Sequence, residues 1–237
     1  RRNPVRKSGP ERVYRTQLRQ VAQQVGALVN GFPPGDPTAA PTIEQLLRRY
    51  AEALTPWAER VAAEMLSEVN RRDEQAWMQQ AKDMSRALRM EIRTAPTGAT
   101  MQVLMAEQVG LIKSIPLEAA QRVHKLTIEG IEDSTRASEI SKASQASGDV
   151  AKSRADLIAR TEVGRTASTL TEARALHVGS PGYFWRTSGD SDVRDSHQKM
   201  NGQFVAWNDP PTLDGMTGHA GQFPNCRCYS EPVIPEE

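Results

Sequence analysis

Apolar residues recur every three or four positions along the chain up to Val178, which is the spacing of one face of an α-helix. After Gly179 this pattern stops, and short runs rich in aromatic residues alternate with Gly, Pro and Asp. Such runs are typical of short strands joined by turns. We therefore expect a mainly α fold, with an elongated helical N-terminal body and a small, turn-rich α+β domain at the C-terminus.

The same patterns divide the chain into three expected parts. These are a basic helical arm with a Pro-rich linker (residues 1–41), a helical body (42–179) and the small domain (180–237). Within the body, proline favours the first turn of a helix, so new helices are expected to begin at Thr55-Pro56 and at Pro116. The small domain is expected to contain one or two helical turns over 193–201 and strands over 183–187, 203–207 and 226–229.

Charge and hydropathy exclude several classes of protein. The 30 Lys and Arg residues are balanced by 29 Asp and Glu residues, whereas a protein that coats nucleic acid needs a large basic excess. No apolar run approaches the ~20 residues of a membrane-spanning helix, so we expect no contact with a membrane. No charged segment followed by an apolar one resembles a secretory leader, and we expect a soluble protein made inside the cell.

The N-terminal arm concentrates positive charge, with Glu11 as its acid. Two interpretations stay open: a solvated helix face, or a contact surface for DNA or an acidic protein. The residues concerned are Arg1, Arg2, Arg6, Lys7, Arg12, Arg15 and Arg19.

Both cysteines lie close together near the C-terminus. In an extended segment, the side chains of Cys226 and Cys228 point to one face, where a disulfide between them would have poor geometry. Two thiolates are half of a tetrahedral zinc site, and His197 and His219 are the histidines of the small domain. The sequence therefore suggests a zinc-stapled domain held by all four residues. The alternative is two cysteines packed as small apolar residues and two surface histidines.

Signs of catalysis are weak. The sequence contains no zincin motif, phosphate-binding loop or nucleophile elbow. The acids near the cysteines, Asp190 and Asp192 among them, are explained by turns. We expect a protein that is not an enzyme, with a metal-dependent nuclease or a toxin as the remote alternative.

A set of motifs in the second half of the chain resembles the signature of the phage Mu F-like minor head proteins, also called head morphogenesis proteins. Residues 111–116 are similar to the helical region that precedes this signature, and the resemblance extends from about Met101 to the end. The signature residues, in order, are Ala159-Arg160-Thr161-Glu162, Tyr183, Trp185, Thr187, Gly189-Asp190, Arg194, His197, Gly202 and Asn225-Cys226-Arg227-Cys228.

This resemblance implies a structural component of a tailed-phage or prophage virion, assembled in the host cytoplasm and acting in head morphogenesis at the portal vertex. The implied partners are the portal protein, on which the chain would be oligomeric, the major capsid protein or scaffold, and packaged double-stranded DNA. The alternative is a zinc-stabilised nucleic-acid-binding protein. The chain departs from the family pattern where Arg194 and His197 replace two cysteines and Phe223 replaces a histidine.

Two charged residues of the signature need partners outside their own pair. Arg160 and Glu162 are two positions apart on a predicted helix and cannot face each other. We expect them to pair with Asp190, Asp192 or Arg194, because a buried ion pair would fix the small domain on the helix.

Overall fold

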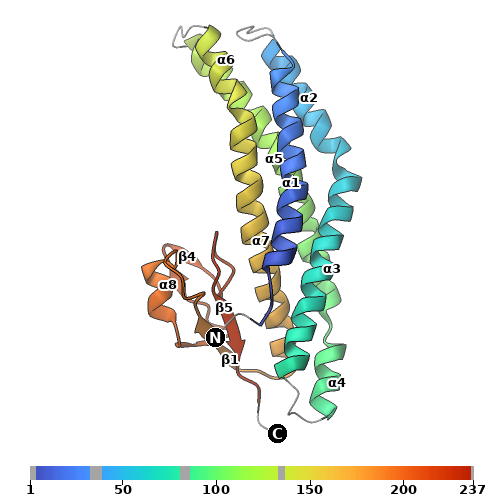
Figure 1. The fold of residues 1–237 in the computed structure, drawn as a ribbon, viewed down its shortest axis with the longest axis vertical. Helices are drawn as coiled ribbons and strands as arrows, with labels where there is room; N and C mark the ends of the chain where they lie inside the picture. The colour runs from blue at the N-terminus through green and yellow to red at the C-terminus, as the bar shows by residue number, and fades with distance from the viewer. Residues whose placement is uncertain (1–3, 33–38, 81–85, 133–136, 236–237) are drawn as a thin grey trace. The chain divides into compact units, whose positions relative to one another are not determined.

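The computed structural model describes residues 4–32, 39–80, 86–132 and 137–235, and these are mainly helical, as predicted (Figure 1). None of the helices in the described part of the chain is long and apolar enough to cross a membrane. The helices before Gly179 are α1 (Ser8–Asn30), α2 (Ala40–Ala53), α3 (Thr55–Gln80), α4 (Arg86–Thr94), α5 (Thr97–Glu132), α6 (Ala137–Gln145) and α7 (Ser147–His177).

Helix α5 runs without interruption through Pro116, so the prediction that a new helix begins there was wrong. Proline removes one backbone donor from a helix interior and normally breaks or kinks it. Here the apolar stripe continues on both sides of the proline, with Ile112, Ile115 and Ala119 all buried. The hydroxyl of Ser114 also donates to the carbonyl of Leu111 at 2.7 Å. Packing of this stripe keeps the helix continuous.

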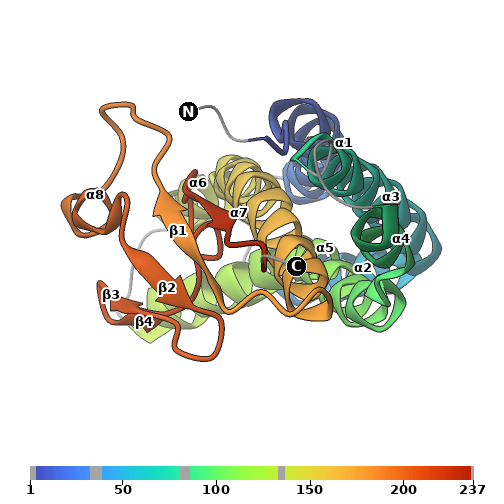
Figure 2. The same ribbon diagram turned by 90° about the horizontal axis from the view of Figure 1, so that it is seen from below.

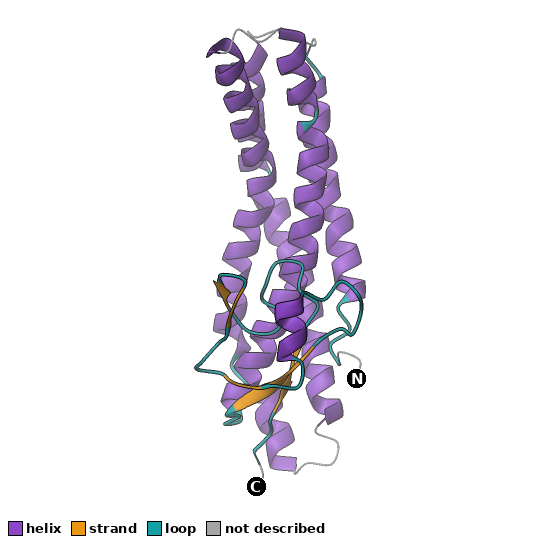
Figure 3. Ribbon diagram, turned by 90° about the vertical axis from the view of Figure 1, so that its left-hand side faces the viewer, coloured by secondary structure: helices purple, strands orange, loops and turns teal. Residues whose placement is uncertain are grey.

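The last quarter of the chain forms a small antiparallel sheet, as predicted (Figures 2 and 3). Its strand order is β2-β1-β5, and Phe184 of β1 lies opposite Phe204 of β2 and Glu231 of β5. The elements of this part are β1 (Gly182–Arg186), α8 (Asp195–Met200), β2 (Phe204–Ala206), β3 (Thr212–Leu213), β4 (Met216–Thr217) and β5 (Tyr229–Pro232).

The third predicted strand was placed too early. Strand β5 begins at Tyr229, so both cysteines lie in the loop before it. Asn225 has a φ of 56°, in the left-handed region, and the amide of Cys226 donates to the carbonyl of Phe223. The chain therefore turns just before the cysteines instead of extending.

Strands β3 and β4 form a hairpin that the sequence analysis did not predict. Its two central residues, Asp214 and Gly215, have φ values of 53° and 78°. Positive φ at both positions defines a type I′ turn, for which Asp-Gly is a preferred sequence. This turn places the carboxylate of Asp214 beside α8.

The described helices and strands belong to two compact units. One contains Arg1–Glu11, Ala63–Met105 and Arg160–Glu237, and the other contains Arg12–Ala62 and Ala106–Ala159. Their boundaries fall inside α1, α3, α5 and α7. The division after residues 41 and 179 stays a prediction.

In the first unit, the core is aromatic. Tyr183 and Trp185 alternate with outward-facing Phe184 along β1, and Tyr183 stacks on Trp207 with 4.5 Å between ring centroids. Trp77 of α3 and Ile92 of α4 are buried in the same cluster. The sheet is therefore built on helices that precede it by about a hundred residues.

In the second unit, α1, α5 and α7 lie alongside one another (Figure 1). Tyr14 and Leu18 of α1 and Ile112 of α5 are fully buried. The hydroxyl of Tyr14 donates to Oε1 of Gln108 at 2.9 Å, so the two buried polar groups satisfy each other.

Candidate metal centre

Three of the four predicted metal ligands come together in the first unit. His197 lies on α8, and Cys226 and Cys228 lie in the loop before β5; all three are buried. Nδ1 of His197 is 3.4 Å from Sγ of Cys226 and 3.6 Å from Sγ of Cys228. The three donor atoms lie within 4.8 Å of one another.

These separations suit zinc. A tetrahedral ion with Zn–S near 2.3 Å and Zn–N near 2.05 Å sets its sulfur and nitrogen ligands about 3.6 Å apart. Two thiolates and one imidazole are also the soft and intermediate ligands that zinc prefers. The residues present therefore fit three of the four positions of a zinc site. Their role would be structural, because all three ligands are buried and come from two separate segments, α8 and the loop before β5.

The imidazole of His197 is held by its surroundings. Its ring packs edge-on against Trp185 and Phe223, with centroid separations of 5.5 and 4.9 Å. Its other nitrogen, Nε2, faces Oδ2 of Asp214 at 3.9 Å, and Ser196 donates to the same oxygen. A carboxylate behind a ligating histidine helps to orient the ring. Asp214 was not among the predicted site residues, and the Asp214-Gly215 turn sequence is the signal that could have located it.

The two thiols strongly influence each other. A hydrogen bond from Cys228 lowers the pKa of Cys226 to about 5, and the same interaction raises the pKa of Cys228. Lys7 lies close by and donates from Nζ to the carbonyl of Cys228 at 3.5 Å. Burial lowers the pKa of Lys7, although the neighbouring cysteines and Glu11 partly oppose this.

His219, the fourth predicted ligand, lies outside the group of His197, Cys226 and Cys228. Its Nδ1 is 3.2 Å from the hydroxyl of Tyr183, and its Nε2 is 3.6 Å from Oε1 of Glu172. The ring packs edge-on against both Tyr183 and Trp207. At least six residues separate His219 from each of the other three predicted ligands in the sequence. This spacing does not determine the direction in which its ring points.

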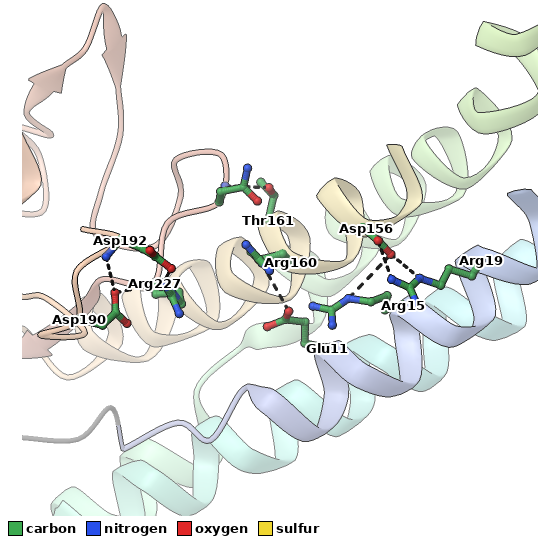
Figure 4. Close-up of polar contacts among 10 residues, drawn as sticks. Glu11, Arg15, Arg19, Asp156, Arg160, Thr161, Asp190, Asp192 and Arg227 are labelled. Atoms are coloured by element: carbon green, nitrogen blue, oxygen red, sulfur yellow. Dashed lines mark hydrogen bonds and ion pairs between the residues drawn. The ribbon is translucent and has the colours of Figure 1, made fainter. Parts of the chain in front are cut away.

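Helix α7 holds the cysteine loop from one side. The amide of Asn225 donates to the hydroxyl of Thr161 at 3.1 Å (Figure 4). Nearby, a Cβ on Gly164 would lie 3.2 Å from the carbonyl oxygen of Gly221, so the loop approaches the helix closely where a side chain is absent. The resemblance drew attention to this part of α7, but Thr161 and Gly164 were not among the predicted contacts.

The loop after β1 holds the cysteine loop from the other side. Arg227 pairs with Asp190 at 3.1 Å and with Asp192 at 2.8 Å (Figure 4), and Arg194 donates to the carbonyl of Pro224 at 2.6 Å. Asp190, Asp192 and Arg194 therefore contact residues of the cysteine loop.

The structure gives Arg160 and Glu162 ion-pair partners other than Asp190, Asp192 and Arg194. Arg160 pairs with Glu11 of α1 at 3.8 Å, as Figure 4 shows, and Glu162 pairs with Arg165 on its own helix at 3.0 Å. Arg160 projects from the exposed side of α7, where Glu11 can reach it.

The described residues of the basic arm lie just before α1 and within it, and they have different surroundings. Arg1 and Arg2 lie outside the described residues. Arg6 and Arg12 are exposed, whereas Lys7 contacts the cysteine loop. In the second unit, Arg19 binds both carboxylate oxygens of Asp156, at 2.6 and 2.7 Å, with Arg15 at 4.0 Å from it (Figure 4).

Comparison with known families identifies the region that carries this centre. Residues 121–231 match the model of the phage Mu protein F like proteins. This region, slightly less than half of the chain, is similar to the phage Mu F-like proteins. The resemblance is thereby confirmed, although residues 111–116 lie outside the matched Mu F-like region. The match includes all three residues of the candidate metal centre.

Curated relatives share only a part of their length with the chain. An uncharacterized protein of Haemophilus influenzae is 31% identical over 134 residues, which are 56% of this chain and 29% of that protein. The NAD(+)--arginine ADP-ribosyltransferase EFV of Enterococcus faecalis is 30% identical over 129 residues, which are 49% of this chain and 26% of the transferase. No solved structure matches.

Proposed function

We propose that the chain is a minor head protein of a tailed phage or prophage, a structural component of the virion that acts in head morphogenesis at the portal vertex. The observation that carries this proposal is the Mu F-like match over residues 121–231.

In this proposal, zinc acts as a structural staple. His197, Cys226 and Cys228 would hold the ion, which would tie α8 to the loop before β5. The donor set and its spacing support this role. Because metal binding is coupled to folding, the bound ion would add to the stability of this region.

The proposed partners are the portal protein, the major capsid protein or scaffold, and packaged double-stranded DNA, with several copies of the chain on the portal. The exposed Arg6 and Arg12 suit an acidic partner or a phosphate backbone. A net charge of +1 lets the protein lie beside DNA without condensing on it.

A deletion of the gene in the phage or prophage that encodes the chain tests this function. We expect electron micrographs of the lysate to show few DNA-filled heads, while tails still form. Wild-type protein supplied from a plasmid should restore filled heads and be found in purified particles by immunoblot. Normal numbers of filled heads in the deletion would refute the proposal.

Two other functions can be separated from this one by direct assays. A dedicated DNA-binding protein should bind duplex DNA with an affinity that falls steeply as salt increases.

The relation to EFV favours a second candidate, an ADP-ribosyltransferase. Because the shared part is only 26% of EFV, we propose that both chains carry a common module beside different functions. Transfer of label from NAD⁺ to an arginine-containing peptide by this chain would contradict that view.

A further inference from the structure

A groove between α5 and α7 in the second unit encloses about 330 Å³ of free space. This volume is at the lower end of the range found for small-molecule sites. Ile115 and Ala119 of α5 and Ala151 of α7 are buried beneath the groove, and Val150 lies at its exposed rim. The groove thus has an apolar floor, which is the usual setting for an organic ligand.

The polar side chains that line this groove are mainly cationic. Arg122, Lys125 and Arg154 carry three positive charges, against the one carboxylate of Glu118 among the lining residues. Glu118 accepts from Nη2 of Arg154 at 3.0 Å. Lys125 pairs with Glu129 at 3.5 Å, but both side chains are well exposed, so this contact is weak. A positive charge is therefore left for a ligand to balance.

Three buried donors at the groove have no acceptor among the described residues. They are the hydroxyl of Ser147 and the Nε atoms of Arg122 and Arg154. Ser147, the first residue of α7, is only 1% exposed. A buried donor without an acceptor costs about 1–3 kcal/mol, so such groups are normally satisfied. What the site lacks is a group with several acceptor oxygens.

We propose that this groove binds an organic anion, in which an oxyanion faces Arg122, Arg154 and Ser147 and an apolar group lies on Ala119 and Ala151. The oxyanion is a phosphate ester or a carboxylate, because both accept several hydrogen bonds from guanidinium groups. The apolar floor distinguishes this site from a surface that attracts any anion. The proposal is independent of the role in head assembly.

Isothermal titration of the full chain tests the site with four probes: phenyl phosphate, benzoate, inorganic phosphate and phenol. We expect saturable binding of phenyl phosphate or benzoate, and the stronger of the two identifies the oxyanion. Inorganic phosphate should bind at least several-fold more weakly than phenyl phosphate, and phenol should not bind measurably. If neither phenyl phosphate nor benzoate shows saturable binding, the proposal is overturned.

Variants locate the binding. Arg154→Gln and Arg122→Gln should each weaken binding about tenfold or more, since a charge-assisted hydrogen bond is worth about 1.5–3 kcal/mol. Ser147→Ala should weaken it less and leaves the charge unchanged. Arg49→Gln is the matched control, because Arg49 is an exposed cation on α2 outside the groove. Equal affinities in Arg154→Gln and Arg49→Gln would overturn the site, provided that circular dichroism shows both variants folded.

Discussion

Asp73 of α3 and Arg174 of α7 form an ion pair in which the two side chains are 0% and 4% exposed. Thr171 donates its hydroxyl to the same carboxylate, and Arg174 also donates to Oδ1 of Asn70 at 2.8 Å. A buried pair adds little net stability compared with apolar residues, but breaking it leaves one charge without compensation. The pair therefore fixes how α3 packs on α7 within the first unit.

Asp73→Ala should reduce the free energy of unfolding by about 3–5 kcal/mol, because Arg174 would remain buried without its partner. Glu68→Ala is the control on the same helix. Glu68 pairs with Arg71 and Arg72 in partly exposed positions, so its loss should cost at most about 1 kcal/mol. Urea denaturation followed by circular dichroism measures both. Similar losses in the two variants would contradict the special role of the buried pair.

The same carboxylate should make stability depend on pH. Burial raises the pKa of Asp73 from 3.8 to about 6, despite the opposing effects of Arg174 and Thr171. Between these values the folded state binds more protons than the unfolded state, so this group destabilises the fold as pH rises from about 4 to 6. The total change is on the order of 3 kcal/mol.

Asp73→Asn removes this titration while keeping a side chain of the same shape. The stability of the wild-type protein should therefore fall relative to that of Asp73→Asn as pH increases through this window. Glu68 should act in the opposite sense and at lower pH, because hydrogen bonds from Arg71 and Arg72 lower its pKa from 4.5 to about 2. The stability of the wild-type protein should therefore rise relative to that of Glu68→Gln as pH increases from about 2 to 4.5. Parallel stability curves for wild type and Asp73→Asn between pH 4 and 6 would contradict the shift.

Gly182 at the start of β1 should not tolerate a side chain. A Cβ there would lie 2.3 Å from the carbonyl oxygen of Val205 and 2.6 Å from the ring of Phe204. Gly182→Ala should therefore destabilise the protein by about 1–3 kcal/mol through overpacking. Gly110→Ala, in the middle of α5, has nothing within 4 Å and should stabilise it by about 0.5–1 kcal/mol. Thermal unfolding measures both shifts, and a stable Gly182→Ala variant would contradict the close approach.

Local patterns in the sequence predicted the elements that are decided locally. The aromatic alternation around Tyr183 and Trp185 indicated β1, and Thr55-Pro56 indicated the start of α3. Pro116 was misjudged because proline acts on one hydrogen bond, whereas packing acts on the whole face of α5. In α5, the packing of the buried apolar face outweighed the loss of one backbone hydrogen bond at Pro116.

Contacts between distant segments could not be predicted in the same way. Cysteine spacing indicated a thiolate pair, and His197 joins it because its ring packs edge-on against Trp185 and Phe223. The family resemblance included His197 and not His219 among the signature residues, but only the fold decides which ring faces the thiols. The contact of Thr161 with Asn225 likewise depends on a turn with positive φ.

A matched pair of histidine variants tests the metal centre. We expect elemental analysis of the purified chain to find about one zinc per molecule, and His197→Gln or Cys226→Ser to lose most of it, because each removes one of the buried ligands. His219→Gln should keep the zinc, since His219 faces Tyr183 and Glu172 instead. Near-UV circular dichroism should confirm that each variant is folded, so that lost zinc reports on ligation. Zinc lost from His219→Gln but retained by His197→Gln would mean that the rings have exchanged roles, and a wild-type chain without metal would reduce the three residues to core packing.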